Sequence, residues 1–105
     1  MVHRKLKRPI VVQISGHSMF PTYQDGDTVY VDPCAYHHSP PQCNDVVLAL
    51  HPYKRGTWIV KRVTQSENNE RLFLEGDNRW ESSDSRSFGS LPLQNIKGKV
   101  IGKKT

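Results

Sequence analysis

Three features that define other classes of protein are scarce or missing in this sequence. Only two of its 105 residues are cysteines, Cys34 and Cys43, which are too few for a disulfide framework. The longest apolar run, Val46 to Leu50, is far shorter than the roughly 18 to 20 residues that cross a bilayer. The opening segment MVHRKLKRPI also lacks the apolar stretch of a secretory signal. We therefore expect a soluble cytoplasmic protein whose thiols are reduced.

Positive charge is scarce in the body of the chain, although the formal net charge is +5. Residues 9–96 hold seven basic and all ten acidic side chains. The basic side chains at the two ends are Arg4, Lys5, Lys7, Arg8, Lys97, Lys99, Lys103 and Lys104. Such tails mostly serve solubility. We predict a basic tail over residues 1–8 and one domain over residues 9–105, and we expect neither a nucleic-acid partner nor a membrane partner.

The segment CAYHHSPPQC places His37 and His38 between Cys34 and Cys43. Thiols and imidazoles together can bind a soft metal, but this spacing matches none of the common zinc patterns. Two prolines and a serine are typical of a flexible surface loop. Free loop residues are therefore the favoured interpretation and a metal site the weaker one, and we predict no metal and no cofactor.

No segment shows a sustained helical period. Short stretches of β-branched and aromatic residues alternate instead with turn signals. The sequence predicts an all-β fold, a small twisted and mostly antiparallel assembly with at most short helical turns, one of them over Ser18 to Gln24. The expected strands are Ile10 to Ser15, Thr28 to Asp32, Asp45 to Leu50, Thr57 to Thr64, Arg71 to Glu75 and Lys97 to Ile101.

The strand over Thr57 to Thr64 contains a lysine in an unusual place. Side chains alternate along a strand, so Ile59, Lys61 and Val63 share one face. If that face points inward, desolvation lowers the pKa of Lys61, and a neutral lysine can act as a general base. Taken alone, the strand favours the other interpretation, a lysine that reaches water at an edge.

Two further segments change the interpretation of Lys61. In SGHSMFPTYQDGD, Ser18 follows a glycine turn that could expose its hydroxyl and align backbone N–H groups for an oxyanion, or Ser18 could simply cap a turn. The segment GDNRWESSDSRSFG is too polar for a buried strand, so its polar groups must be satisfied by one another, by backbone or by a ligand. Three such segments in one chain are hard to obtain by chance.

Together, SGHSMFPT, VKRV and GDNRWESSDSRSFG resemble, in order and spacing, the three motifs of the signal peptidase I-like Ser-Lys endopeptidases. The resemblance implies the signal peptidase/LexA-like catalytic core. It also implies that Ser18 is the nucleophile, that Lys61 is the general base and that the Ser18 backbone N–H helps to form the oxyanion hole. Ser82 would orient the lysine amine. The charged residues that would brace the site are Arg62, Asp77, Asp84 and Arg86.

The chain also departs from that family pattern. Gly16 stands where many bacterial members have a serine that contributes to the oxyanion hole, and Trp80 and Glu81 replace a polar pair. The membrane anchor and the inserted β-domain of bacterial signal peptidases have no counterpart in the sequence. A minimal homologue without an anchor, with the segments SSDSRSFG and VLALHPY, most resembles the subgroup that matures nickel-type superoxide dismutase in the cytoplasm of bacteria.

The sequence therefore predicts a serine endopeptidase that removes an N-terminal extension from a precursor protein, with the nickel superoxide dismutase precursor as the expected substrate. Two alternatives stay open. One is a membrane-associated type I signal peptidase that cleaves exported preproteins. The other is a non-catalytic binding module with basic tails, against which the Ser18, Lys61 and Ser82 set argues. A self-cleaving LexA-like regulator would need a DNA-binding domain, for which the length leaves no room.

Overall fold

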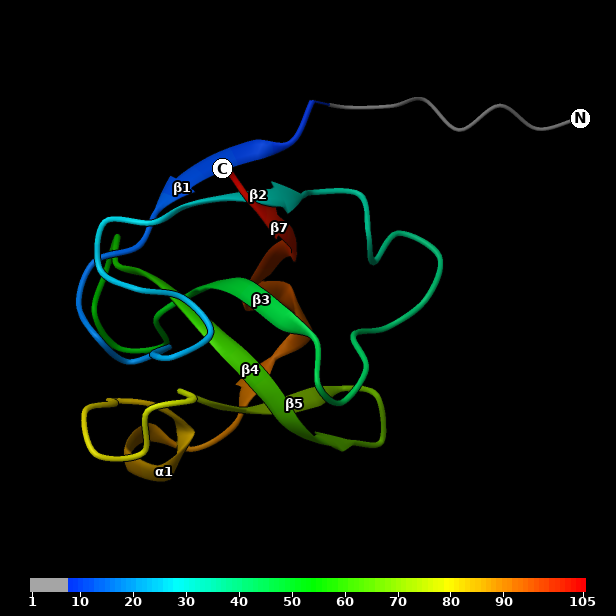
Figure 1. Ribbon diagram of the computed structural model, residues 1–105. Coiled ribbons are helices and arrows are strands. Elements are labelled where there is room, and N and C mark those ends of the chain that lie inside the picture. The colour runs from blue at the N-terminus through cyan, green and yellow to red at the C-terminus, as the bar shows by residue number, and fades with distance from the viewer. Residues whose placement is uncertain (1–7) are drawn as a thin grey trace, which may run out of the picture.

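A single curled antiparallel sheet forms the body of the protein, as the computed structural model of residues 8–105 shows (Figure 1). The strand order is β1-β2-β7-β3-β4-β5-β6. The strands are β1 (Ile10–Gln13), β2 (Thr28–Asp32), β3 (Val46–Leu50), β4 (Trp58–Glu67), β5 (Arg71–Glu75), β6 (Leu91–Pro92) and β7 (Ile96–Lys103). Helical structure in the described residues is confined to α1 (Ser85–Phe88) and the 3-10 turn η1 (Leu93–Asn95). The predicted all-β fold is confirmed.

The expected strands form close to their predicted bounds. The segment after β1 contains hydrogen-bonded turns and no regular helix: the Phe20 N–H donates to the His17 carbonyl at 3.2 Å, and the Tyr23 N–H donates to the Met19 carbonyl at 3.0 Å. β6 was not expected, and β4 and β7 extend further than predicted. The predicted basic tail lies outside the described residues except for Arg8.

Two hydrophobic clusters hold the sheet together, and β3 contributes to both. Val46 and Leu48 pack into a cluster with residues of β2, β7 and the turn after β1, whereas Val47 and Ala49 pack into a second cluster with residues of β4, β5 and β6. These alternate side chains lie on opposite faces of the strand. The short apolar run in the sequence is thus a central strand that is buried on both faces.

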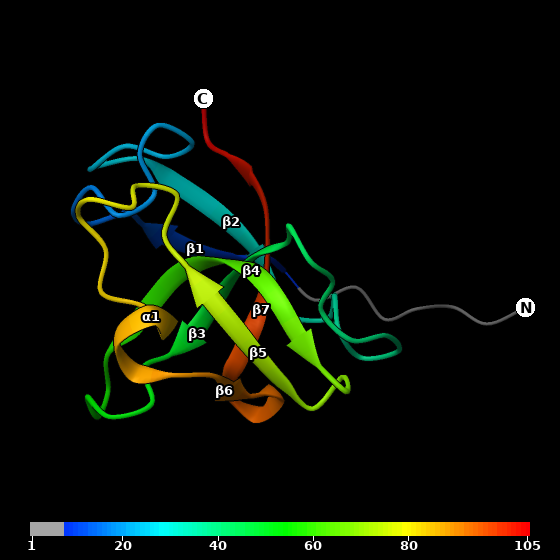
Figure 2. The same cartoon turned by 90° about the horizontal axis from the view of Figure 1, so that it is seen from below.

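Two of the strand edges that have no partner strand among the described residues lie near the turn after β1 or on the first half of β4. β1 pairs only with β2, so its other edge is open. β5 pairs with β4 only from Arg62 onward, and the earlier residues of β4, Trp58 to Lys61, pair only with β3. The turn after β1 and the segment between β5 and α1 also lie side by side (Figure 2), because the Asn78 N–H donates to the Ser18 carbonyl. The open edges and these two segments frame one region of the molecule.

Candidate active site

Ser18 lies in the turn that follows β1, and its neighbours fix that turn. Gly16 has a φ of +88°, and its N–H donates to Asp25 Oδ1 at 2.8 Å. Met19, directly after Ser18, is buried in the first hydrophobic cluster. A positive φ favours glycine. The serine that many family members have at the Gly16 position would therefore be strained in this backbone.

Lys61 is buried, with 5% of its surface exposed. Its strand neighbours Ile59 and Val63 belong to the second hydrophobic cluster, as the predicted alternation requires. The Lys61 Nζ donates to Ser82 Oγ at 3.1 Å. Burial lowers the pKa of Lys61 and the positive charge of Arg86 lowers it further, while the negative charge of Asp84 opposes them. The prediction of a desolvated lysine is confirmed, and the lysine that reaches water is excluded.

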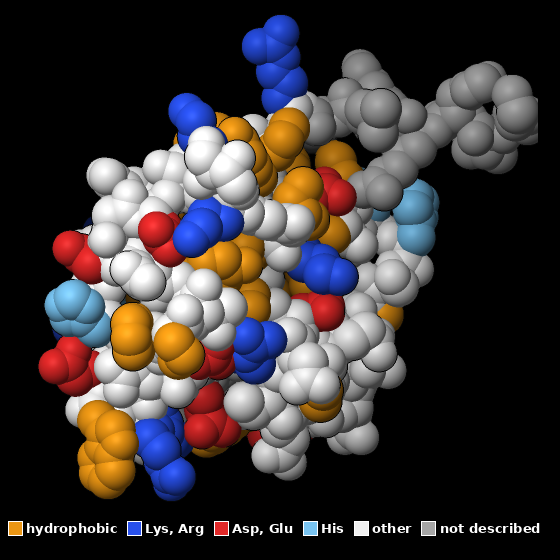
Figure 3. All heavy atoms as spheres, in the orientation of Figure 1, with side chains coloured by type: hydrophobic (Ala, Val, Ile, Leu, Met, Phe, Trp, Pro, Cys, Tyr) orange, Lys and Arg blue, Asp and Glu red, His pale blue; other side chains and the backbone are white. Residues whose placement is uncertain are grey.

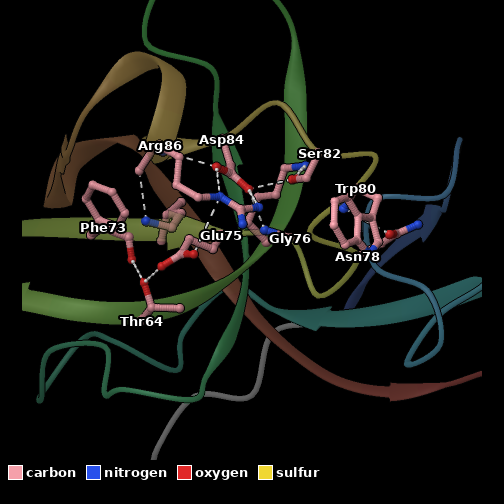
Figure 4. A network of polar contacts seen from close by, with 12 residues as sticks. Thr64, Phe73, Glu75, Gly76, Asn78, Trp80, Ser82, Asp84 and Arg86 are labelled. Carbon is pink, nitrogen blue, oxygen red and sulfur yellow. Dashed lines mark hydrogen bonds and ion pairs between the residues drawn. The ribbon is translucent and has the colours of Figure 1, made fainter.

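Ser82 links Lys61 to a buried carboxylate. Figure 4 shows the part of this network that includes Ser82, Asp84 and Arg86. The Ser82 hydroxyl donates to Asp84 Oδ2 at 2.5 Å, and the Gly76 N–H donates to the same oxygen at 2.8 Å. Arg86 donates to both oxygens of Asp84, which is fully buried. Burial alone would raise the pKa of Asp84, but the hydrogen bonds from Arg86, Ser82 and the backbone lower it well below its usual range. The carboxylate is therefore charged, and it fixes the position of the Ser82 hydroxyl.

A second ion pair anchors the segment that follows β5. Arg62 donates to both oxygens of Asp77, each at 2.8 Å, and the Thr22 hydroxyl donates to Asp77 as well. The hydrogen bonds between Arg62 and Asp77 are the leading cause that raises the pKa of the arginine and lowers that of the aspartate. Thr22 lies in the turn after β1. The ion pair and the Thr22 hydrogen bond therefore connect β4 to the segment after β5 and to the turn after β1.

Two residues of the third motif had no predicted role, and both position the Ser18 turn. Asn78 donates its backbone N–H to the Ser18 carbonyl at 2.8 Å and its side-chain Nδ2 to the His17 carbonyl at 3.0 Å. A Cβ built on Gly76 would lie 2.5 Å from the Ser18 carbonyl oxygen and would also collide with Ser82 Oγ. Only glycine fits there. The sequence signal was the GDN triplet itself, of which the prediction used only Asp77.

Ser18 and Lys61 line one open cavity of about 350 Å³. Its walls include side chains on or next to the open strand edges, Val12, Ile14 and Val60. The hairpin between β3 and β4 contributes His51, Lys54 and Thr57 to the lining, three residues that the sequence analysis did not single out. The structure thus brings Ser18, Lys61 and Ser82 to one region, with Arg62, Asp77, Asp84 and Arg86 bracing it.

Comparison with known proteins identifies the family of this chain. The family described as "Signal peptidase, peptidase S26" matches residues 9–66 and 64–103. The chain belongs to this family. It is 33% identical to the human mitochondrial inner membrane protease subunit 1 over 89% of this chain and 68% of that protein. It is 30% identical to the probable signal peptidase I-1 of Synechocystis sp., over 84% of this chain and 67% of that protein.

Membership of the signal peptidase family makes the chain a serine peptidase of the hydrolase class. The predicted cytoplasmic location is wrong, because the relatives are named for membranes, among them a thylakoidal processing peptidase of Arabidopsis thaliana that is 24% identical. No helix within residues 8–105 is long and apolar enough to span a bilayer. The specific resemblance to nickel superoxide dismutase maturation proteases finds no support among these relatives.

The cysteine segment shows no metal-binding arrangement in the part of the chain that the structure describes. Both cysteines are free thiols, Cys34 buried and Cys43 exposed. The Tyr36 hydroxyl donates to Asp45 Oδ2 at 2.8 Å, so the loop is held by this hydrogen bond. On the face shown in Figure 3, basic and acidic side chains are interspersed, so this face has no continuous basic patch among the described residues.

Proposed function

We propose that the protein is a Ser-Lys endopeptidase that removes leader peptides from precursor proteins. The observation that supports this most directly is the buried Lys61, which lines the same cavity as Ser18 and is oriented by Ser82. Burial lowers its pKa, which favours the neutral amine that a general base requires. In this proposal Ser18 is the nucleophile and Lys61 is the general base.

The reaction proceeds in two steps. Lys61 takes the proton of the Ser18 hydroxyl while the oxygen attacks the peptide carbonyl carbon, and the resulting ammonium gives its proton to the leaving amine. A water molecule that Lys61 deprotonates then attacks the acyl carbon. The bond from that carbon to the Ser18 oxygen breaks, Lys61 returns the proton to this oxygen, and the leader is released with a free carboxylate. The Ser18 N–H makes no hydrogen bond within the described residues. It is therefore available to stabilise the oxyanion.

Substrate binds to this site in an extended conformation. Both β1 and the first half of β4 leave one edge unpaired beside the cavity, and an extended peptide can add to such an edge through main-chain hydrogen bonds. Membership of the signal peptidase family supports leader peptides as the substrate. The nickel superoxide dismutase precursor is the more specific prediction from the sequence, and the same assay tests it.

Single and double substitutions at Ser18 and Lys61 test the dyad. Ser18→Ala and Lys61→Ala should each reduce kcat/KM by about 10³-fold or more, and the double variant should be no worse, because groups that act as one unit are non-additive. Ser82→Ala should cost less, since it orients the amine and does not react. Losses that multiply in the double variant would show that Lys61 is only structural.

The substrate is tested with two precursors. A preprotein presented in lipid vesicles and a soluble nickel superoxide dismutase precursor are incubated with the purified chain, and the new N-termini are measured by mass spectrometry. We expect cleavage of the vesicle-bound preprotein at one bond. Cleavage of the dismutase precursor alone would restore the more specific prediction. Failure on both, with Ser18 also unreactive toward acylating probes, would favour the non-catalytic binding module.

A further inference from the structure

The hairpin between β3 and β4 holds a buried histidine in a fixed position in the lining of the cavity. His51 is 8% exposed, and its backbone N–H donates to the Thr57 carbonyl at 2.7 Å. Its Nδ1 accepts the backbone N–H groups of Tyr53 and Lys54, each at 3.0 Å. The ring packs at a tilt of 58° against Phe88 of α1, with 4.8 Å between ring centroids. The hydrogen bonds at Nδ1 and the packing against Phe88 therefore fix the position of the ring.

The two hydrogen bonds to Nδ1 also determine which ring nitrogen carries the proton when His51 is neutral. A nitrogen that accepts two hydrogen bonds has no proton, so the proton of neutral His51 lies on Nε2. Burial lowers the pKa of His51, and the charges of Lys54 and Lys61 lower it further. Within the described residues Nε2 has no hydrogen-bond partner. His51 therefore keeps one unused N–H donor.

The residues around His51 determine the charge and the hydrogen-bond donors of this part of the cavity. His51, Lys54 and Thr57 line the same cavity as Ser18 and Lys61. Elsewhere the lining mixes aliphatic side chains with Gln13, Trp58, Lys61 and three serines, and no acidic side chain is among the described residues that line the cavity. The Lys54 ammonium and the unused N–H of His51 therefore favour a ligand that is negatively charged and accepts hydrogen bonds.

We infer that the part of the cavity lined by this hairpin is a specificity site for an acidic side chain of the substrate, with the His51 Nε2–H and the Lys54 ammonium as its donors. This inference rests on the proposed function, because it concerns a peptide bound beside Ser18. His51 and Lys54 contact the substrate and take no part in bond cleavage. An Asp or Glu near the scissile bond should therefore strengthen binding, and a Lys at the same position should weaken it.

Charge reversal at Lys54 tests the inference, and Arg55 supplies the matched control. Both side chains are exposed and lie on the same hairpin, but only Lys54 lines the cavity. A peptide series carries Asp, Asn or Lys in turn at each position around the cleavage site. At one position, wild type should favour Asp over Lys in kcat/KM by about tenfold, and Lys54→Glu should abolish or invert that preference. Arg55→Glu should leave the preference unchanged.

A second pair of variants tests the histidine. The carbonyl oxygen of His51→Asn can still accept the hairpin N–H groups, but this variant lacks the Nε2–H, whereas the side chain of His51→Gln is long enough to place an N–H near the position of Nε2. We expect His51→Asn to lose several-fold of the preference for Asp over Lys in kcat/KM. His51→Gln should restore part of the preference.

Binding separates failure of this inference from failure of the proposed function. The dissociation constants of the same peptides are measured with the Ser18→Ala chain, which binds without cleaving. A preference for Asp in binding that Lys54→Glu inverts supports the specificity site even if catalysis is absent. Equal affinity for the Asp and Lys peptides, or the same preference in Lys54→Glu as in wild type, would overturn it while leaving the serine peptidase assignment intact.

Discussion

At the scale of single residues, the site depends on one glycine that allows two segments to meet. Gly76 lies against the Ser18 carbonyl and the Ser82 side chain, and its N–H donates to Asp84. Gly76→Ala would push a methyl group into the backbone of the nucleophile turn, which cannot move without losing the Asn78 hydrogen bonds. We expect kcat/KM to fall by at least about tenfold, together with a loss of about 1–3 kcal/mol in unfolding free energy.

Gly102→Ala is the matched control for this prediction. A Cβ at Gly102 in β7 would meet nothing within 4 Å, and its φ lies outside the left-handed region. Denaturant unfolding and kcat/KM, measured for both variants and wild type, give the comparison. If Gly76→Ala kept full activity, the close packing of the third motif against the Ser18 turn would not be needed for catalysis.

At the scale of elements, burial is the main cause that lowers the pKa of Lys61 on β4, and α1 adds to it. Arg86 of α1 lowers the pKa of Lys61 by its charge, and it also pairs with Asp84, which acts in the opposite direction. Arg86→Gln removes the positive charge that lowers the pKa of Lys61. It also removes the partner of Asp84, so the negative charge of Asp84 raises this pKa more strongly. Both changes raise the pKa of Lys61, so less of the lysine is neutral at a given pH. The acidic limb of the kcat/KM profile should move to higher pH.

Arg71→Gln on β5 serves as the control for the pH profile, because Arg71 bonds to Ser90 and is absent from the causes that shift the pKa of Lys61. Its profile should coincide with that of wild type. Thermal unfolding of both variants shows whether either has lost its fold. An Arg86→Gln profile with an unshifted acidic limb would mean that Lys61 does not act as the base.

The elements that the sequence predicted well are those whose pattern is local. β2 and β5 have the predicted bounds because alternating side chains and flanking turn residues define them without outside help. β6 is different, since its two residues become a strand only by pairing with Arg71 and Leu72 of β5. Nothing in the sequence around Leu91 and Pro92 shows that partner.

The same distinction applies to the site. The alternation in β4 was enough to predict that Ile59, Lys61 and Val63 share a face, and the structure buries that face. The hydrogen bond from Asn78 to the His17 carbonyl joins residues 61 positions apart, which no local pattern encodes. His51 was missed for a related reason, because a single histidine at a strand end has no spacing that marks it.

At the scale of the whole molecule, the buried Lys61 should lower the unfolding free energy of the protein. Lys61 is buried against the second hydrophobic cluster, and protonating it there costs free energy that a methionine would not cost. Lys61→Met should be inactive but more stable than wild type near neutral pH by on the order of 1 kcal/mol. For a chain of this size, that corresponds to a rise in Tm of about 4–8 °C.

The pH dependence of this gain identifies its cause. The pKa of Lys61 is lowered from 10.5 in the folded state, so between the two values the unfolded chain holds a proton that the folded chain has released. Unfolding free energy therefore rises with pH across that window for wild type.

The stability advantage of Lys61→Met over wild type should shrink as the pH approaches 10.5, whereas the exposed Lys104→Met should differ little from wild type at any pH. Differential scanning calorimetry from pH 6 upward measures this, and a Lys61→Met advantage that stayed constant with pH would mean that packing, and not the buried charge, is the cause.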